Sequence, residues 1–157
     1  MSSRARIEDF LNQKRFAFVG VSRQPRDFSR AVFREFCAKG WDPVPVHPQA
    51  NEIEGRRCYA RLQDIQPPVD SALLMTSPAV TAKVADECVA AGVKRVWFHR
   101  GGVVNQAAID NCEAHGLSVI PGECPLMFLP QAGFVHRFHA FVKKIRGTYP
   151  IAESRTS

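Results

Sequence analysis

The sequence predicts an α/β fold in which helices cover both faces of a mainly parallel sheet of five strands. Two observations carry this prediction. Five short apolar segments recur along the 157 residues, and amphipathic stretches of about 10 to 15 residues separate most of them. Consecutive parallel strands need a crossover connection, which is usually a helix. We therefore expect one three-layer, Rossmann-like domain over residues 1–150 and a frayed tail at 151–157.

The predicted strands are the segments richest in apolar side chains. The first, residues 16–20, is almost continuously apolar, as expected for a strand buried on both faces. The second, residues 42–48, contains Pro43 and Pro45, which cannot donate hydrogen bonds, so its ladder is expected to be incomplete. The other three strands are expected over residues 71–76, 94–99 and 117–121.

The predicted helices follow from apolar residues that recur at helical spacing. One helix ends at Gly40, and another begins at Ser77-Pro78, where a capping hydroxyl precedes a proline at the first helical position. Their apolar faces are Phe28, Val32 and Phe36 in the first and Val80, Val84 and Cys88 in the second. A third helix is expected over residues 105–115. The polar segment 49–68 is expected to be a long connection with at most a short helix near residues 62–65.

An added C-terminal amphipathic helix is expected over residues 134–145. Its apolar side chains form one stripe, and basic side chains lie off it. This pattern fits a helix that packs on the domain or on a second subunit, which would make a homodimer. A helix that binds a membrane surface or a partner protein is the alternative interpretation.

The composition excludes several classes of protein. Hydrophobic residues make up 45% of the chain and charged residues 23%, which rules out collagen-like and wholly disordered proteins. No apolar run approaches the roughly 18 to 20 residues of a membrane helix, and no secretory signal is visible at residues 1–6. A cytoplasmic protein without membrane contact is expected. The five cysteines include no Cys-x-x-Cys pair, so they are interpreted as reduced thiols.

The net charge of +6 arises from the two ends of the chain. Residues 16–124 carry twelve basic and twelve acidic side chains, so the excess lies in residues 1–15 and 125–157. Proteins that follow a nucleic-acid backbone usually spread basic side chains over a folded face. No nucleic-acid partner is therefore expected.

The candidate site is expected at the carboxyl ends of the strands. In an open parallel sheet, ligands bind beyond these ends, near the point where the strand order reverses. This places the site in the loops at residues 20–29, 47–58, 76–79, 99–104 and 121–125.

The loop after the first strand has the composition of an anion-binding turn. Gly20 lies at the strand end, Ser22 and Ser29 supply hydroxyls, and a helix begins at Asp27 or Ser29. Helix N-termini bind phosphate through unpaired N–H groups and a partial positive charge. Four arginines lie within residues 23–34 and suit a polyanionic ligand, namely Arg23, Arg26, Arg30 and Arg34. An arginine-rich, solvated turn is the alternative interpretation.

The dinucleotide fingerprint is absent, because no second or third glycine follows Gly20 at the Gly-x-Gly-x-x-Gly spacing. An NAD-binding domain also carries an acid at the end of its second strand, where this chain has His47-Pro48. These features argue against NAD. They fit an adenosine ligand with an extra phosphate, a description that covers both NADP and coenzyme A.

A series of short motifs follows a characteristic order along the chain. They are Phe18-Val19-Gly20-Val21-Ser22, Val44-Pro45-Val46-His47-Pro48, Gly55-Arg56-Arg57-Cys58-Tyr59, Leu62-Gln63-Asp64-Ile65, Val69-Asp70, Val96-Trp97, Asn105 and Glu123-Cys124-Pro125. In their order and spacing, over about residues 14–128, these motifs resemble the small stand-alone CoA-binding proteins, which are similar to the N-terminal CoA-binding domain of the succinyl-CoA synthetase α subunit.

The resemblance implies a Rossmann-like fold that holds coenzyme A by its ADP portion. Gly20, Val21, Ser22 and the helix start at Ser29-Arg30 would contact phosphate, and His47-Pro48 would line the adenosine pocket. The chain departs from the family at several positions. The family commonly has Asn-Pro at His47-Pro48, Tyr-Pro-Ser at Tyr59-Ala60-Arg61 and Gln at His99, and Gly101-Gly102 adds a residue.

The full set of predicted ligand-binding residues combines the first loop with the other strand ends. They are Gly20, Val21, Ser22, Arg23, Arg26, Ser29, Arg30, His47, Pro48, Thr76, Ser77, Gly101 and Cys124. Cys124 follows the fifth strand, where its thiol would either meet the CoA thiol in a mixed disulfide or serve as a small buried apolar group. No metal site is expected, since neither His136-x-x-His139 nor Cys112-x-x-His115 has a visible partner pair.

We expect a protein that binds coenzyme A or an acyl-CoA non-covalently. No Gly-x-Ser-x-Gly elbow, Walker loop or His-Glu-x-x-His motif is present, so a ligand-binding protein is expected rather than an enzyme. The ligase chemistry of the synthetases is not implied, because the resemblance ends before the part that carries it. An NADP-dependent oxidoreductase and a nucleotide-binding regulatory module are the alternative functions.

Overall fold

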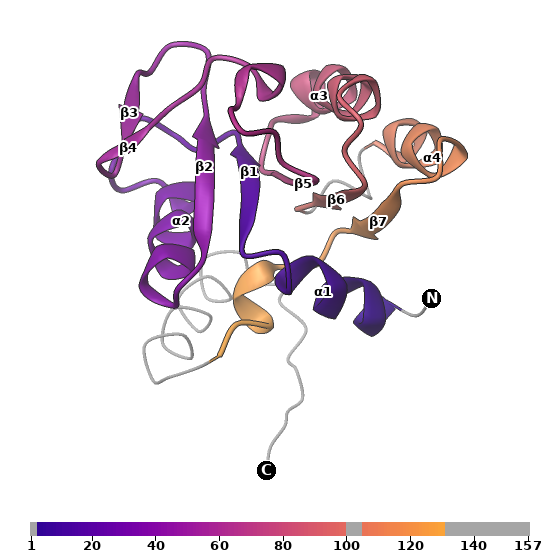
Figure 1. The fold of residues 1–157 in the computed structure, drawn as a ribbon, viewed down its shortest axis with the longest axis horizontal. Coiled ribbons are helices and arrows are strands. Elements are labelled where there is room, and N and C mark those ends of the chain that lie inside the picture. The colour runs from indigo at the N-terminus through magenta and orange to yellow at the C-terminus, as the bar shows by residue number, and fades with distance from the viewer. Residues whose placement is uncertain (1–2, 100–104, 131–157) are drawn as a thin grey trace.

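A computed structural model describes residues 3–99 and 105–130, and its centre is a parallel sheet of five strands. Figure 1 shows the arrangement. The strands lie in the order β2-β1-β5-β6-β7, and every neighbouring pair is parallel. The strands are β1 (Arg15–Val19), β2 (Asp42–Val46), β5 (Ser71–Leu74), β6 (Arg95–Phe98) and β7 (Ser118–Pro121). The predicted α/β, Rossmann-like fold is confirmed.

Helices cover both faces of this sheet, which gives the predicted three layers. The helices α3 and α4 lie together on one face, and α1 and α2 lie on the other (Figure 1). They are α1 (Ser3–Leu11), α2 (Phe28–Ala38), α3 (Pro78–Ala90) and α4 (Gln106–Ala114). The predicted C-terminal helix at 134–145 and the tail at 151–157 lie outside the described residues. No described helix has the length and apolar character needed to cross a membrane.

Alternate residues of each strand enter two different apolar cores. In β1, Ala17 and Val19 pack in the core beneath α3 and α4, whereas Phe16 and Phe18 pack in the core beneath α1 and α2. This alternation follows from the two-residue period of a strand. Because both faces are covered, the strand reads as a continuous apolar run in the sequence.

The prolines of β2 are tolerated because β2 is an edge strand of the five-stranded sheet. On its outer side, near its carboxyl end, the Tyr59 N–H donates to the Pro45 carbonyl at 3.0 Å, and the His47 N–H donates to the Tyr59 carbonyl at 2.9 Å. These bonds hold the segment that follows Tyr59 beside the carboxyl end of β2. That segment later forms one wall of the site.

Two parts of the chain carry more regular structure than the sequence predicted. Residues 1–15 received no element, yet they contain α1, which buries Ile7 and Phe10. The polar connection contains a two-stranded antiparallel hairpin, β3 (Glu52–Ile53) and β4 (Arg56–Arg57). The short helix near residues 62–65 is confirmed as a 3-10 turn, η1 (Leu62–Asp64), and a second such turn, η2, spans Pro125–Met127.

The strand order fixes where a ligand can bind. The chain passes from β1 outward to β2 and then returns to β5 on the other side of β1. The crossovers on either side of this point lie on opposite faces of the sheet, so a crevice opens beyond the carboxyl ends of β1 and β5. The loops that follow β1, β2 and β5 meet there.

Candidate functional site

A cavity of about 610 Å³ lies at the carboxyl ends of β1, β2 and β5, where the strand order reverses. Its walls come from the loop after β1, the loop after β2, the segment after Tyr59 and the first turns of α3. The lining residues are Val19, Gly20, Val21, Ser22, Val46, His47, Pro48, Ala60, Arg61, Met75, Thr76, Ser77, Val80, Lys83, Val84 and Glu87. The cavity therefore combines backbone from loops with side chains of one helix.

The structure brings seven of the thirteen predicted site residues together around this cavity. They are Gly20, Val21, Ser22, His47, Pro48, Thr76 and Ser77. Arg23, Arg26, Ser29, Arg30 and Cys124 do not line the cavity, and Gly101 lies outside the described residues.

Gly20 is required at the end of β1 by its backbone conformation and by a close approach. Its φ is +96°, and a Cβ at this position would lie 2.6 Å from the carbonyl oxygen of Met75. No side chain fits at that distance, and L residues rarely adopt this φ. Gly20 therefore allows the ends of β1 and β5 to meet closely at the base of the cavity.

Several backbone N–H groups near the cavity have no acceptor among the described residues. The Gly20 N–H donates to the Val46 carbonyl and the Ser22 N–H donates to the Ser29 hydroxyl, at 3.3 and 2.8 Å. Val21 lies between these two residues and Arg23 follows them. The N–H groups of Val21 and Arg23 have no acceptor in the part of the chain that is described. Of these two residues Arg23 is exposed and Val21 is fully buried, so the Arg23 N–H is the better placed of the two to meet an anionic ligand.

The two helices next to the cavity differ in how their N-termini are satisfied. At α2, the Asp27 carboxylate accepts from both the N–H and the hydroxyl of Ser29, at 2.8 and 2.7 Å. At α3, the Ser77 side chain makes no capping hydrogen bond, and Ser77 lines the cavity. The start of α2, which was predicted to receive phosphate, thus has its own carboxylate, whereas the start of α3 has none and places the Ser77 residue in the cavity wall.

His47 presents a neutral imidazole at the end of β2. Its Nδ1 accepts from the Gln49 N–H at 2.9 Å, so Nε2 carries the proton in this arrangement. Partial burial lowers the pKa of His47 below its usual value, and the positive charge of Arg23 lowers it further. His47 therefore offers an N–H donor, and the single carboxylate among the lining residues, Glu87, comes from α3 and not from the end of β2.

The lowered pKa of His47 predicts a specific dependence of stability on pH. Because the folded protein disfavours the proton, the unfolded chain binds it first as the pH falls below the usual histidine value of about 6.5. The free energy of unfolding should be highest above that pH and should decrease below it. We expect the melting temperature to fall between pH 7.5 and pH 5.5, and to fall less for His47→Asn than for the unmodified protein. Equal decreases would contradict this assignment.

The outer part of the cavity combines an apolar wall with charged side chains that the sequence analysis did not select. Val80 is 44% exposed and lies one turn before the buried Val84. Arg61 and Lys83 form no ion pair with any described residue, and Glu87 supplies one negative charge. The sequence predicts the apolar face of α3, but it does not show that Val80 at the start of this face is exposed while Val84 and Cys88 are buried. Nothing local marked Arg61, because its place depends on the pairing of Tyr59 with β2.

The cysteines do not form a reactive centre in the described part of the chain. All five lie in the described part of the chain, and none of them forms a disulfide there. Burial raises the pKa of Cys88, and burial together with Asp86 and Glu113 raises the pKa of Cys112 to about 11. Cys124 is half-buried and packs against the α1/α2 core. No group of three or more potential metal ligands occurs within residues 3–99 and 105–130.

This arrangement suits non-covalent binding of an elongated, partly anionic ligand. Free N–H groups and the open start of α3 would hold an anion at the inner end. The wall of Val80 and Val84 offers an apolar surface for a flat ring, and Arg61 and Lys83 add positive charge at the rim.

Comparison with known proteins identifies similar chains. The sequence model of a family described as "CoA binding domain" matches residues 14–130. An uncharacterized protein of Bacillus subtilis, YneT, is 28% identical over 123 residues, which cover 78% of this chain and 90% of that protein. The ADP-forming acetate–CoA ligase of Methanocaldococcus jannaschii is 28% identical over 81 residues. Those residues cover 52% of this chain and only 12% of the ligase.

Solved structures show the same fold. A hypothetical protein from Pyrococcus horikoshii superposes with a TM-score of 0.73 at 26% sequence identity. The similarity covers 80% of this chain and 87% of the Pyrococcus chain. The arrangement of strands and helices described above is therefore shared with a chain of similar extent.

Proposed function

This chain belongs to the CoA binding domain family, and we propose that it binds coenzyme A or an acyl-CoA through the ADP portion, in the cavity at the ends of β1, β2 and β5. One observation carries the proposal. The family match, residues 14–130, spans every segment that lines the cavity. A ligand of this family would thus meet an open site where an α/β sheet binds nucleotides.

The diphosphate lies at the inner end of the cavity in this proposal. The unpaired Arg23 N–H, which follows Ser22 of the cavity wall, and the Ser77 hydroxyl, which makes no capping bond to α3, supply donors there. Each donor would gain a charge-assisted hydrogen bond, which is stronger than a bond between neutral groups. Gly20 keeps the floor of this region free of side-chain atoms.

The adenosine lies between the end of β2 and the face of α3. The Val80 and Val84 side chains provide an apolar surface for the adenine ring. His47 and the nearby Arg23 meet the ribose and its 3′-phosphate as donor and cation. The end of β2 carries His47-Pro48 and no acid that would suit the free ribose hydroxyls of NAD.

The function we propose is binding without chemistry carried out by this chain. The described thiols that show a resolved shift are held protonated by burial, and no described side chain combines a nucleophile with a base at the cavity. Such a protein would sense, store or present CoA. The family match does not favour an NADP-dependent oxidoreductase, which serves as the competing hypothesis in the test.

The proposal predicts that a negative charge on the apolar wall abolishes tight binding of CoA. Val80 occupies the third position of α3, where an aspartate suits the helix N-terminus, so Val80→Asp should fold normally. We expect isothermal titration to show at least about tenfold weaker CoA binding, which corresponds to about 1.4 kcal/mol. The cause is repulsion of the phosphates and loss of the adenine contact.

Met127→Asp is the matched control for this substitution. Met127 is the other large apolar side chain exposed among the described residues, at 39%, and it does not line the cavity. Its substitution should leave CoA affinity unchanged within about twofold. Tighter binding of NADPH than of CoA to the unmodified protein would overturn the proposal, as would equal effects of the two substitutions.

A further inference from the structure

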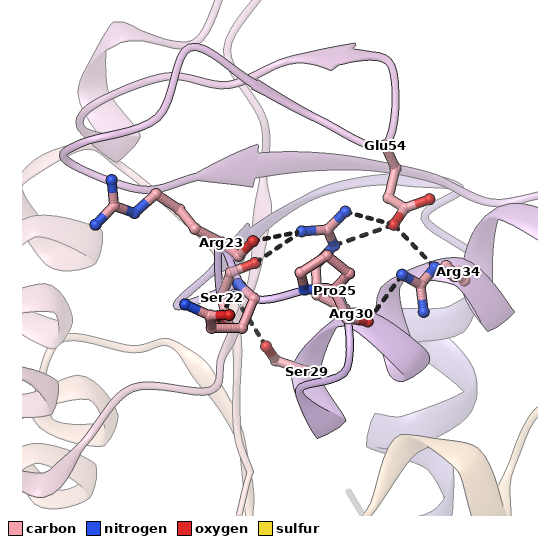
Figure 2. Close-up of polar contacts among 8 residues, drawn as sticks. Ser22, Arg23, Pro25, Ser29, Arg30, Arg34 and Glu54 are labelled. Atoms are coloured by element: carbon pink, nitrogen blue, oxygen red, sulfur yellow. Dashed lines mark hydrogen bonds and ion pairs between the residues drawn. The ribbon is translucent and has the colours of Figure 1, made fainter.

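The side chain of Arg30, in the first turn of α2, contacts the backbone of the loop after β1. Its guanidinium Nη1 donates to the carbonyl oxygens of Ser22 and Arg23, both at 3.2 Å. Figure 2 shows this guanidinium lying between the loop and the β3–β4 hairpin. The side chain is only 11% exposed, so its position is fixed by these contacts rather than by solvent.

The opposite side of the Arg30 guanidinium is held by Glu54. One carboxylate oxygen of Glu54 accepts from Arg30 Nη2 at 2.6 Å, from Arg30 Nε at 3.1 Å and from Arg34 Nε at 2.8 Å (Figure 2). Although burial raises the pKa of Glu54, its hydrogen bonds and the charges of Arg30 and Arg34 outweigh burial and lower it. Glu54 is therefore ionised at neutral pH and orients Arg30.

The backbone of the hairpin directs Glu54 toward α2. Glu54 and Gly55 form the two-residue turn between β3 and β4, and both have positive φ, at 51° and 76°. This is the backbone of a type I′ hairpin turn, which has a narrow range of conformations. The hairpin thus presents the Glu54 carboxylate to α2, the helix beside the candidate site, although Glu54 lies 24 residues after Arg30 in the chain.

The contact with the Ser22 carbonyl determines the direction of a donor in the site. In a trans peptide the carbonyl and the following N–H point in opposite directions within one plane. Because Arg30 holds the Ser22 carbonyl, the Arg23 N–H points away from Arg30. This N–H has no acceptor among the residues that the structure describes, and Ser22 itself lines the cavity.

We propose that Arg30 is a positioning residue that fixes the loop after β1 in its ligand-binding conformation, with Glu54 of the hairpin as its anchor. This inference rests on the proposed binding of CoA at the same loop. It assigns Arg30 a role different from the phosphate contact expected from the sequence. Arg30 acts through the peptide groups of the loop, and it couples the hairpin to the site.

Titration of CoA and adenosine against three variants tests this role. Arg30→Gln removes the charged fork, and we expect it to weaken CoA binding by about tenfold or more. Adenosine lacks the diphosphate, so its affinity should change by less than about twofold. Arg34→Gln is the matched control, because Arg34 also contacts Glu54 and one carbonyl of the loop, but that carbonyl is Pro25, which does not line the cavity, rather than Ser22 or Arg23. It should leave both affinities within about twofold.

Glu54→Gln separates positioning from direct contact, because the two roles predict changes of opposite sign. If Arg30 contacted phosphate, its release from Glu54 would strengthen CoA binding. As a positioning residue it loses its anchor, and we expect CoA binding to weaken by about two- to fivefold. Stronger binding by Glu54→Gln, or equal losses for Arg30→Gln and Arg34→Gln, would overturn the inference.

Amide hydrogen exchange of the ligand-free protein keeps this test independent of the proposed function. The Ser22 and Gln24 N–H groups are hydrogen-bonded within the loop, at 2.8 and 3.0 Å. Their exchange should accelerate in Arg30→Gln and stay unchanged in Arg34→Gln. Failure of the unmodified protein to bind CoA would reject the proposed function alone, whereas unchanged exchange in Arg30→Gln would reject the positioning role.

Discussion

Gly20→Ala is expected to remove CoA binding and to lower the free energy of unfolding by about 2 to 5 kcal/mol. Part of this loss is the conformational cost of a φ of +96° for an L residue, about 1 to 2 kcal/mol. The rest comes from overpacking, because the new Cβ would lie 2.6 Å from the Met75 carbonyl oxygen and 3.0 Å from Thr76 Cγ2. Both neighbours are backbone or short side chain and cannot turn aside.

The same clash would move the floor of the candidate site. Met75 and Thr76 line the cavity, and the loop after β1 begins at Gly20. To admit the Cβ, the ends of β1 and β5 must separate, which displaces the N–H groups of Val21 and Thr76 relative to each other. Binding geometry that is wrong by a few tenths of an ångström weakens hydrogen bonds to phosphate steeply.

Gly40→Ala is the matched control for Gly20→Ala. Gly40 has nearly the same φ, +99°, but a Cβ there would meet no atom within 4 Å. It therefore carries the conformational cost of about 1 to 2 kcal/mol without the clash. Chemical denaturation and CoA titration of both variants provide the measurement. If Gly40→Ala lost as much stability as Gly20→Ala, or if Gly20→Ala bound CoA normally, the close approach would not matter to the site.

The sequence was sufficient for the parts of this fold that local patterns encode. The apolar run at residues 16–20 marks a strand covered on both faces, and the spacing of Val32 and Phe36 marks the buried side of α2. The prolines of β2 indicate missing hydrogen bonds to a neighbouring strand, which an edge strand accommodates. The order of the strands then located the cavity, because ligand sites follow topology in this class of fold.

The elements that escaped prediction have weak local signals. In α1 only Ile7 and Phe10 are buried, three residues apart in a segment where four of nine residues are charged, and a single pair does not define an amphipathic face. The β3–β4 hairpin turns at Glu54-Gly55 and has strands of two residues each. Such short strands have no measurable period, and the hairpin is held by Arg30 and Arg34 of α2.

The roles of the loop arginines could not be read from the sequence for a related reason. Four arginines near a strand end favour an anion site only if no acid of the protein pairs with them. Arg30 and Arg34 are paired with Glu54, which is 24 and 20 residues away in the chain. The sequence shows the cations but not this long-range partner. Arg23 and Arg26 of the same loop form no ion pair with a described residue, and neither do Arg61 and Lys83, which line the cavity.

Trp97→Ala is expected to lower the free energy of unfolding by about 3 to 5 kcal/mol. Trp97 is fully buried in β6, its ring meets the edge of Phe10 at a centroid distance of 5.2 Å, and its Nε1 donates to the Glu123 carbonyl at 2.8 Å. The substitution leaves a large cavity beneath α1 and an unsatisfied carbonyl. Since domains of this size are stable by about 5 to 15 kcal/mol, the loss is a large part of the total.

Trp97→Phe separates the ring from its hydrogen bond. It keeps most of the contact with Phe10 and loses the bond to Glu123, so we expect a smaller loss of about 1 to 2 kcal/mol. Urea denaturation of both variants measures these changes in the free energy of unfolding. An equal loss for Trp97→Phe and Trp97→Ala would show that the ring contacts contribute little.

Trp97→Ala should leave CoA affinity unchanged, whereas Gly20→Ala should remove CoA binding. Trp97 packs in the α1/α2 core. Val21 of that core lines the cavity, but Val19, Val46 and Val84 of the cavity wall belong to the core on the other face of the sheet. The molecules that remain folded should therefore bind CoA with affinity unchanged within about twofold, since distant sites act almost independently. A large loss of affinity in Trp97→Ala would mean that the two cores are coupled through the sheet, and that stability and binding share one structural unit.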